Sequence, residues 1–136
     1  MGIDFDEMGK KFHAKLDSGI DHLKAAKTNL ETFAQETEDA IQTKLNAAKE
    51  TLEAKKQEAA SAREKMEAYI KDKAEDTEAA VAEWKANHDR KKLEKRAERT
   101  EKYAGSCVDL ALYYAAEAQV AILEAAAARQ DADDAA

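Results

Sequence analysis

The chain has 136 residues, no proline and a formal net charge of −7, and 38% of its residues are charged. This length predicts one domain. The excess of acidic residues disfavours nucleic acid as the main partner, because phosphate binding needs a basic surface. Only 6% of the residues are aromatic. A thick globular core is therefore not expected, and the surfaces that can be buried are narrow seams between helices.

The N-terminal sequence MGIDFDEMGK is acidic and lacks the apolar region of a signal peptide. Asp6 stands where an N-myristoylation signal has Ser or Thr. We therefore expect a cytoplasmic protein. Cys107 is the only cysteine, so no internal disulfide and no Cys-rich metal site is expected.

The first helical pattern covers residues 5–33. Its large apolar residues recur at steps of mostly three or four, which predicts an amphipathic helix with one apolar stripe. We expect this stripe to pack in a core rather than to meet a ligand or lipid. It consists of Phe5, Met8, Phe12, Leu16, Ile20, Leu23, Leu30 and Phe33.

The middle of the chain changes its period to eleven residues, as at Leu30, Ile41 and Leu52. A hendecad repeat keeps an apolar stripe nearly straight along a helix. The segment TKLNAAKETLEAKKQEAASAREKMEAYIKDKAEDTEAA, residues 43–80, resembles the eleven-residue amphipathic repeats of group 3 late-embryogenesis-abundant proteins and of exchangeable apolipoproteins. The resemblance implies helices that bind lipid surfaces or protect other molecules on drying. The ends of the chain are richer in apolar residues than those repeats, which favours a packed protein.

The most apolar stretch is AGSCVDLALYYAAEAQVAILEAAAA, residues 104–128. Asp109, Glu117 and Glu124 interrupt it, and carboxylates are costly within a bilayer, so it is not expected to span a membrane. These three residues share one narrow strip of a helix, which indicates a helix buried on several sides. At Gly105 and Ser106 two interpretations stay open: one helix ends and another begins, or a single helix tolerates the glycine.

The leading architecture is all-α: a long antiparallel, coiled-coil-like hairpin within a single domain, residues 1–136. Its parts are a first helical arm (3–70), a turn (71–79), a return arm (80–104), an apolar C-terminal helix (107–130) and a tail (131–136). Asp72, Asp76 and Thr77 are suited to cap helices at this turn.

A three-helix bundle is the alternative architecture. Asn87 would end one helix and Asp89 would cap the next, and another turn would fall near residues 28–43, where Thr28 and Glu31 make a capping box.

In the hairpin, residues whose numbers sum to about 136 face each other, so Phe12 lies opposite Leu123, Leu16 opposite Val120 and Leu23 opposite Tyr113. The predicted intrachain core is Phe12, Leu16, Leu23, Tyr113, Val120 and Leu123. Other faces of the C-terminal helix stay uncovered, which marks an interface. The predicted self-association surface is Leu112, Tyr114, Ala118, Ile122 and Ala125. Two hairpins would join there into a homodimeric four-helix bundle.

Chemistry-bearing patterns are sparse. The histidines form no zinc or di-iron motif, and the ladder of His13, Asp17 and Asp21 is expected to be solvated rather than to hold a cation. Cys107 is expected to be buried and inert. The basic stretch 89–102 has interleaved glutamates, which favours a solvated, salt-bridged face over a surface for RNA or anionic lipid. We therefore expect no catalytic, cofactor or metal site.

The sequence thus predicts a non-catalytic helical structural or interaction protein that acts through coiled-coil self-association. The expected partner is a second copy of the chain, and another protein or an anionic lipid surface is also compatible with the stripes. The alternative function is reversible, peripheral binding of a lipid or granule surface through the amphipathic stripes.

Overall fold

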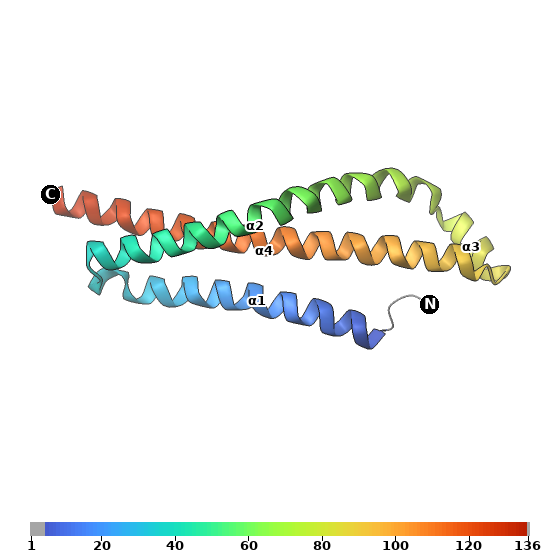
Figure 1. Cartoon of the computed structure of the whole chain (residues 1–136), viewed down its shortest axis with the longest axis horizontal. Coiled ribbons are helices and arrows are strands. Elements are labelled where there is room, and N and C mark those ends of the chain that lie inside the picture. The colour runs from blue at the N-terminus through green and yellow to red at the C-terminus, as the bar shows by residue number, and fades with distance from the viewer. Residues whose placement is uncertain (1–4, 136) are drawn as a thin grey trace.

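The structure is a computed structural model that describes residues 5–135, although not the side chain of Phe5, and every regular element in it is helical (Figure 1). The prediction of an all-α fold made of long packed helices is confirmed. The helices are α1 (Phe5–Thr32), α2 (Glu38–Asp72), α3 (Glu78–Ala86) and α4 (Arg90–Ala135), with single 3₁₀ turns at Phe33–Gln35 and Lys73–Glu75.

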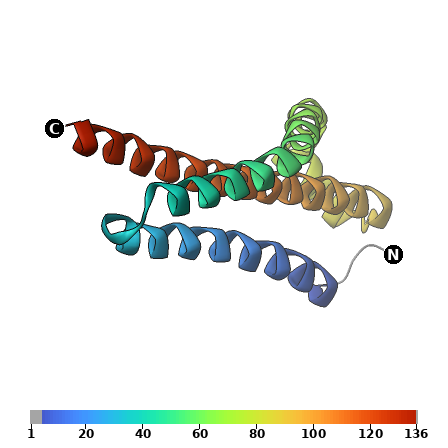
Figure 2. The same cartoon turned by 60° about the vertical axis from the view of Figure 1, so that its left-hand side comes forward.

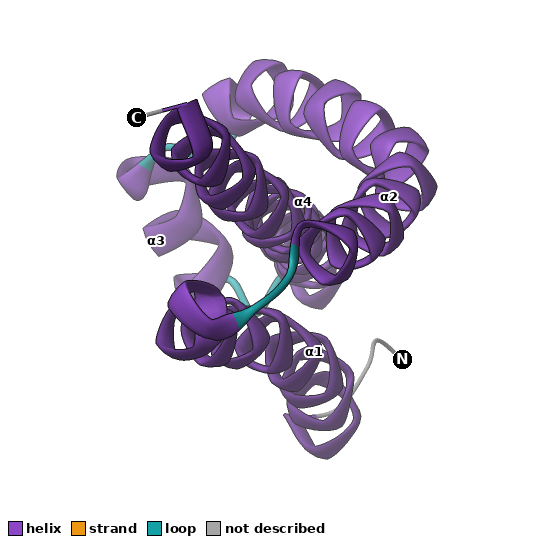
Figure 3. Ribbon diagram, turned by 90° about the vertical axis from the view of Figure 1, so that its left-hand side faces the viewer, coloured by secondary structure: helices purple, strands orange, loops and turns teal. Residues whose placement is uncertain are grey.

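Helix α4 packs against both α1 and α2 and forms the centre of the molecule, as the end-on view in Figure 3 shows. α1 and α4 run in the same direction, since Lys15 Nζ donates to Asp109 Oδ1 over 2.7 Å and Gln130 Nε2 donates to the Glu36 carbonyl over 3.1 Å. α2 runs the opposite way along α4 (Figure 2). The long antiparallel helix pair therefore exists, and α1 is added to it as a third, parallel helix.

Hydroxyl and carboxylate caps start the helices after each break. Thr37 Oγ1 accepts a hydrogen bond from Ala40 N over 3.2 Å, and Thr77 Oγ1 accepts one from Ala80 N over 3.1 Å. Asp89 Oδ1 accepts from Lys92 N over 3.2 Å. Each cap satisfies one of the backbone donors that a helix start leaves without an intrahelical partner. The preceding residue, His88, has a φ of 52°, which ends the helical path after α3.

Several predicted boundaries differ from the structure. From residue 5, where the described part begins, the arm predicted over residues 3–70 is two helices, because the chain reverses between α1 and α2. The predicted turn at 71–79 is present, and so is the break at Asn87 and Asp89 from the alternative architecture. The first reversal, at residues 33–37, falls within the range 28–43 of the alternative architecture, but Thr28 and Glu31 lie inside α1 and start no helix.

At Gly105 the single-helix interpretation is correct. α4 runs without interruption through Gly105 and Ser106, and the predicted tail 131–136 is helical as far as Ala135. Ser106 Oγ donates to the Lys102 carbonyl over 3.0 Å, so its hydroxyl is satisfied within the helix rather than used as a cap.

The predicted pairing of residues whose numbers sum to 136 is wrong, because α2, not the N-terminal segment, lies antiparallel to the C-terminal part of α4. Lys49 Nζ lies 3.9 Å from Glu124 Oε1, and Arg63 Nη2 lies 3.1 Å from the Tyr114 hydroxyl. The reversal at residues 33–37 places the apolar start of α2 beside the end of α4. The main buried cluster there is Leu45, Ala48, Val120 and Leu123, with Phe33 and Leu52 packed against it.

The connection between α2 and α4 is tied back onto α4. Arg99 forms an ion pair with Asp76, whose side chain is almost fully buried. Val81 of α3 is buried, and the ammonium group of Lys92 lies 5.8 Å from the centre of the Trp84 ring. These contacts hold the end of α2 next to the start of α4. The connection through α3 cannot move unless these contacts break.

The contact between α1 and α4 depends on a small residue in α1. A Cβ atom added at Gly19 would lie 2.9 Å from Leu112 Cδ2, which is closer than real Cβ contacts, whereas one added at Gly9 would meet nothing within 4 Å. Gly19 therefore lets the Leu112 side chain pack directly on the backbone of α1.

This difference predicts unequal responses to alanine at the two positions. Gly9→Ala is expected to raise the free energy of unfolding by about 0.5–1 kcal/mol, because alanine restricts the unfolded chain and favours helix. Gly19→Ala should raise the free energy of unfolding by less than Gly9→Ala does, or should lower it, since its methyl group displaces the Leu112 side chain. Urea unfolding of both variants measures the difference. Equal gains at the two positions would show that Leu112 does not pack against Gly19.

Candidate functional site

The apolar segment of α4 is covered on two faces by the same chain. Leu112 and Ala116 are buried in this segment, and Val120 and Leu123 are buried where α2 packs on it. Helix α1 lies along another face, with Gly19 next to Leu112. The expectation of a helix buried on several sides agrees with this packing, but the covering helices are α1 and α2 rather than a single antiparallel arm.

Helix α4 is also long and apolar enough, by length and composition alone, to be a candidate membrane span. Its best 18-residue window has a mean hydropathy of 1.2, and 33% of that window is buried inside the structure. The core helix of a soluble protein satisfies the same criterion. Asp109, Glu117 and Glu124 belong to the same helix, so the expectation that it does not span a membrane stays a prediction.

The predicted self-association residues of α4 have different environments. Tyr114 is 53% exposed and Ala125 is also exposed, whereas Ala118 and Ile122 are half-buried. Leu112 was predicted to lie at an interface between chains but is buried within the chain. The reason for this correction is the parallel packing of α1, which brings Gly19 onto Leu112.

The predicted intrachain core is only partly a core. Val120 and Leu123 are buried, and Phe12 and Tyr113 are half-buried. Leu16 and Leu23 are exposed to 50% and 53%, so their assignment to the intrachain core is wrong. Helix α1 presents a neighbouring face to α4, which carries the residues Phe12, Lys15, Gly19 and Ala26.

The apolar stripe of α1 is consequently half-exposed. Leu16, Ile20, Leu23 and Leu30 are 50%, 48%, 53% and 57% exposed. The periodic signal for an amphipathic helix was read correctly, but the seven-residue spacing of Leu16, Leu23 and Leu30 was missed. That spacing is typical of one seam position in paired helices, and it could have separated this row from the residues that contact α4.

Aromatic residues gather where α2 meets the middle of α4. The rings of Tyr69 and Tyr103 stack with centroids 4.3 Å apart. The pKa of the Tyr103 hydroxyl lies above its ordinary value, chiefly because of its hydrogen bond with the Cys107 side chain. The Arg63 guanidinium lies 6.0 Å from the centre of the Tyr114 ring and bonds to its hydroxyl, which raises the pKa of Arg63. Cys107 is half-buried rather than buried as expected.

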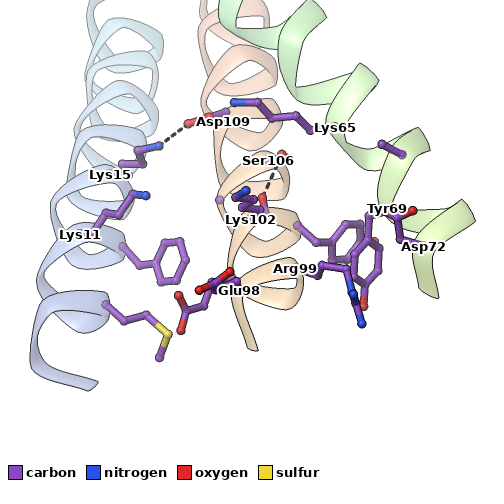
Figure 4. A pocket seen from close by; sticks show the side chains of 16 residues that line it. Lys11, Lys15, Lys65, Tyr69, Asp72, Glu98, Arg99, Lys102, Ser106 and Asp109 are labelled. Atoms are coloured by element: carbon purple, nitrogen blue, oxygen red, sulfur yellow. Dashed lines mark hydrogen bonds and ion pairs between the residues drawn. The ribbon is translucent and has the colours of Figure 1, made fainter. Parts of the chain in front are cut away.

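An open groove of about 830 Å³ lies between the start of α1, the end of α2 and the first half of α4 (Figure 4). Met8, Phe12, Tyr69 and Tyr103 give it apolar walls, and basic and acidic side chains complete its lining. The charges are nearly balanced: the basic residues are Lys11, Lys15, Lys65, Arg99 and Lys102, and the acidic residues are Asp72, Glu98, Glu101 and Asp109. Such a lining attracts neither anions nor cations strongly.

Two polar side chains of the groove are engaged within the chain. Its one hydroxyl on an aliphatic side chain, that of Ser106, donates to a backbone carbonyl, and Lys15 is engaged with Asp109. Within residues 5–135 no group of three or more His, Cys, Asp or Glu side chains is placed to hold a metal ion. His13 Nδ1 lies 3.0 Å from Asp17 Oδ2 in the predicted ladder, and both side chains are exposed.

Two helix faces in the described part of the chain are apolar and at least half exposed: the leucine row of α1 and the face of α4 around Tyr114. Both faces are bordered by charged side chains. No protein-family model, no curated protein and no solved structure matches the chain.

Proposed function

We propose that the chain is a non-catalytic, cytoplasmic helical protein that acts by coiled-coil-like association with a second copy of itself. The observation that carries this proposal is the row of four large aliphatic side chains on α1, each about half exposed. A contiguous apolar surface of this kind marks an interaction site on a soluble protein. Association that removes this surface from water is stabilised by about 25 cal/mol for each Å² of apolar area that is buried.

The basic stretch argues against nucleic acid as the partner. Arg90 Nε lies 3.0 Å from Glu94 Oε1, Lys92 stacks over Trp84, and Arg99 pairs with Asp76. Side chains that are engaged with their own chain are poorly placed to neutralise phosphates, and the net charge of −7 opposes such a partner.

Binding of a lipid or granule surface is the second candidate. Lys24 and Lys27 are exposed on the same helix as the leucine row, and an amphipathic helix with lysines beside its apolar face can lie in the interface of an anionic membrane. The resemblance of residues 43–80 to lipid-binding repeats points in the same direction.

Sedimentation equilibrium without lipid separates the two candidates. We expect a mass of two 15.0 kDa chains at tens of micromolar protein, together with high helicity by circular dichroism. A fully helical protein with the mass of one chain over this concentration range would contradict self-association. Helicity that appears only with anionic vesicles would favour the lipid surface instead.

A further inference from the structure

The exposed side chains of α1 follow a heptad pattern. Leu16, Leu23 and Leu30 are seven residues apart, and Ile20 lies between the first two. In heptad notation the leucines occupy position d, and His13, Ile20 and Lys27 occupy position a. A row of this kind is the seam through which one helix packs against another. Among the described residues nothing covers it, because these leucines and Ile20 are all about half exposed.

The neighbouring helices of the same chain lie on other sides of α1. Phe12, Gly19 and Ala26, also seven apart, fall at position g and face α4. Ala14 and Ser18, on the side of α1 away from the leucine row, line a small cavity together with Glu58 of α2. The flank of the seam that remains open is therefore position e.

Position e carries charges of alternating sign: Lys10, Asp17, Lys24 and Glu31, all exposed. When two identical helices pair antiparallel, position e of one meets position e of the other. With Ile20 packed beside Leu23 of the second copy, Asp17 lies beside Lys24 of the second copy, and Lys10 beside Glu31 of the second copy. Two-fold symmetry repeats both pairs, so all four charges meet an opposite charge.

We propose, on the basis of the proposed self-association, that α1 pairs antiparallel with α1 of a second copy through Leu16, Ile20, Leu23 and Leu30. Charge complementarity selects this occupant and this orientation. A parallel pair would bring Lys27 against Lys27 in the seam, where like charges repel. In the antiparallel pair Lys27 lies beside Leu16 of the second copy, and its aliphatic stem covers the leucine while its ammonium group reaches water.

A lysine in the seam tests the surface. Leu23→Lys is expected to weaken the dimer at least tenfold in sedimentation equilibrium, because it places a charge in the centre of the seam. Thr28→Lys adds the same charge to an exposed site on another side of α1 and should leave the dimer unchanged. Unchanged helicity of the Leu23→Lys chain in circular dichroism shows that it is folded. A dimer that survives Leu23→Lys overturns the proposal.

A charge swap tests the orientation. Asp17→Lys places lysine beside Lys24 of the second copy twice per dimer, and we expect about 4- to 30-fold weaker association. Adding Lys24→Asp to the same chain restores opposite charges in the antiparallel pair and should return most of the affinity. A double variant no tighter than Asp17→Lys overturns the antiparallel register.

Cross-linking gives an independent readout of orientation. With Cys107→Ser in every chain, a chain carrying Lys10→Cys and another carrying Glu31→Cys should form a disulfide only when mixed. In the antiparallel pair, two copies of either cysteine would lie about 31 Å apart along the helix axis, because 21 residues separate the two positions at about 1.5 Å each. Disulfide formation by either chain alone, and none on mixing, would overturn the proposal.

The outcomes distinguish this inference from the proposed function. A wild-type chain that stays monomeric refutes self-association altogether. A wild-type dimer that resists Leu23→Lys but dissociates with Ile122→Lys retains the proposed function and moves the interface to α4, around Tyr114. Only dissociation by Leu23→Lys, with rescue of Asp17→Lys by Lys24→Asp, supports pairing of α1 with α1.

Discussion

Leu123→Ala is expected to lower the free energy of unfolding by about 2–5 kcal/mol, the usual range for leucine truncated to alanine in a core. Leu123 is 1% exposed and packs with Leu45, Ala48 and Val120, where α2 closes over the end of α4. Removing its branched end leaves a cavity that α2 and α4 cannot easily close, because the hydrogen bond from Gln130 Nε2 to the Glu36 carbonyl ties the start of α2 to the end of α4.

Thr51→Ala is the matched control on α2. Thr51 is only half-buried, and its hydroxyl donates to the Ala47 carbonyl of its own helix over 3.2 Å. Its loss should change the free energy of unfolding by less than about 0.5–1 kcal/mol. Urea unfolding at one fixed protein concentration keeps any contribution of association equal. Similar losses for the two variants would refute the location of the core at the end of α4.

The second large effect is expected from overpacking, at Ala59. This residue is 0% exposed in the middle of α2, and Ala62 of α2 and Ala116 of α4 are buried as well. Small side chains let the two helix backbones approach closely. Ala59→Leu inserts three carbons into this contact and should destabilise by about 1–3 kcal/mol, because the helices must separate or the leucine must leave its preferred rotamer.

Ala60→Leu provides the control, because the neighbouring position is exposed. Both substitutions make the same change in side chain and in helix propensity, so the difference between their thermal midpoints reports the packing of α2 on α4. A midpoint for Ala59→Leu equal to that of Ala60→Leu would show that α2 does not pack tightly at Ala59.

The helical class and all three breaks could be predicted, two of the breaks from local capping signals. The absence of proline and the apolar periods indicate helix, and Thr77 and Asp89 do cap helices after the breaks. The reversal before α2 falls within the predicted range 28–43, but its cap was misassigned because Thr28 and Glu31 imitate a capping box inside a continuing helix. Thr37, the real cap, has Ala40 at the position where such a box has Glu or Gln.

The candidate surfaces were harder to predict. The spacing of apolar residues shows which side of a helix is apolar, but it does not show which other helix packs against that side. Leu16 and Leu23 belong to the stripe of α1, yet Gly19 and Ala26 allow closer approach of α4 on an adjacent side. Because α1 runs parallel to α4, Leu112 contacts Gly19 of the same chain and is not free for a partner. Tyr114 and Ala125 are exposed, but the dimer that would cover them remains a prediction.

The uninterrupted length of α4 has a hydrodynamic consequence. Its 46 residues span about 69 Å at about 1.5 Å per residue. A compact globular protein of 136 residues would have a radius of gyration of only about 14 Å. Even a single copy is therefore a rod with high friction for its mass, and it should elute from a sizing column earlier than a compact 15.0 kDa protein. Column elution alone would make a monomer resemble a dimer, so the number of chains has to come from methods that do not depend on shape.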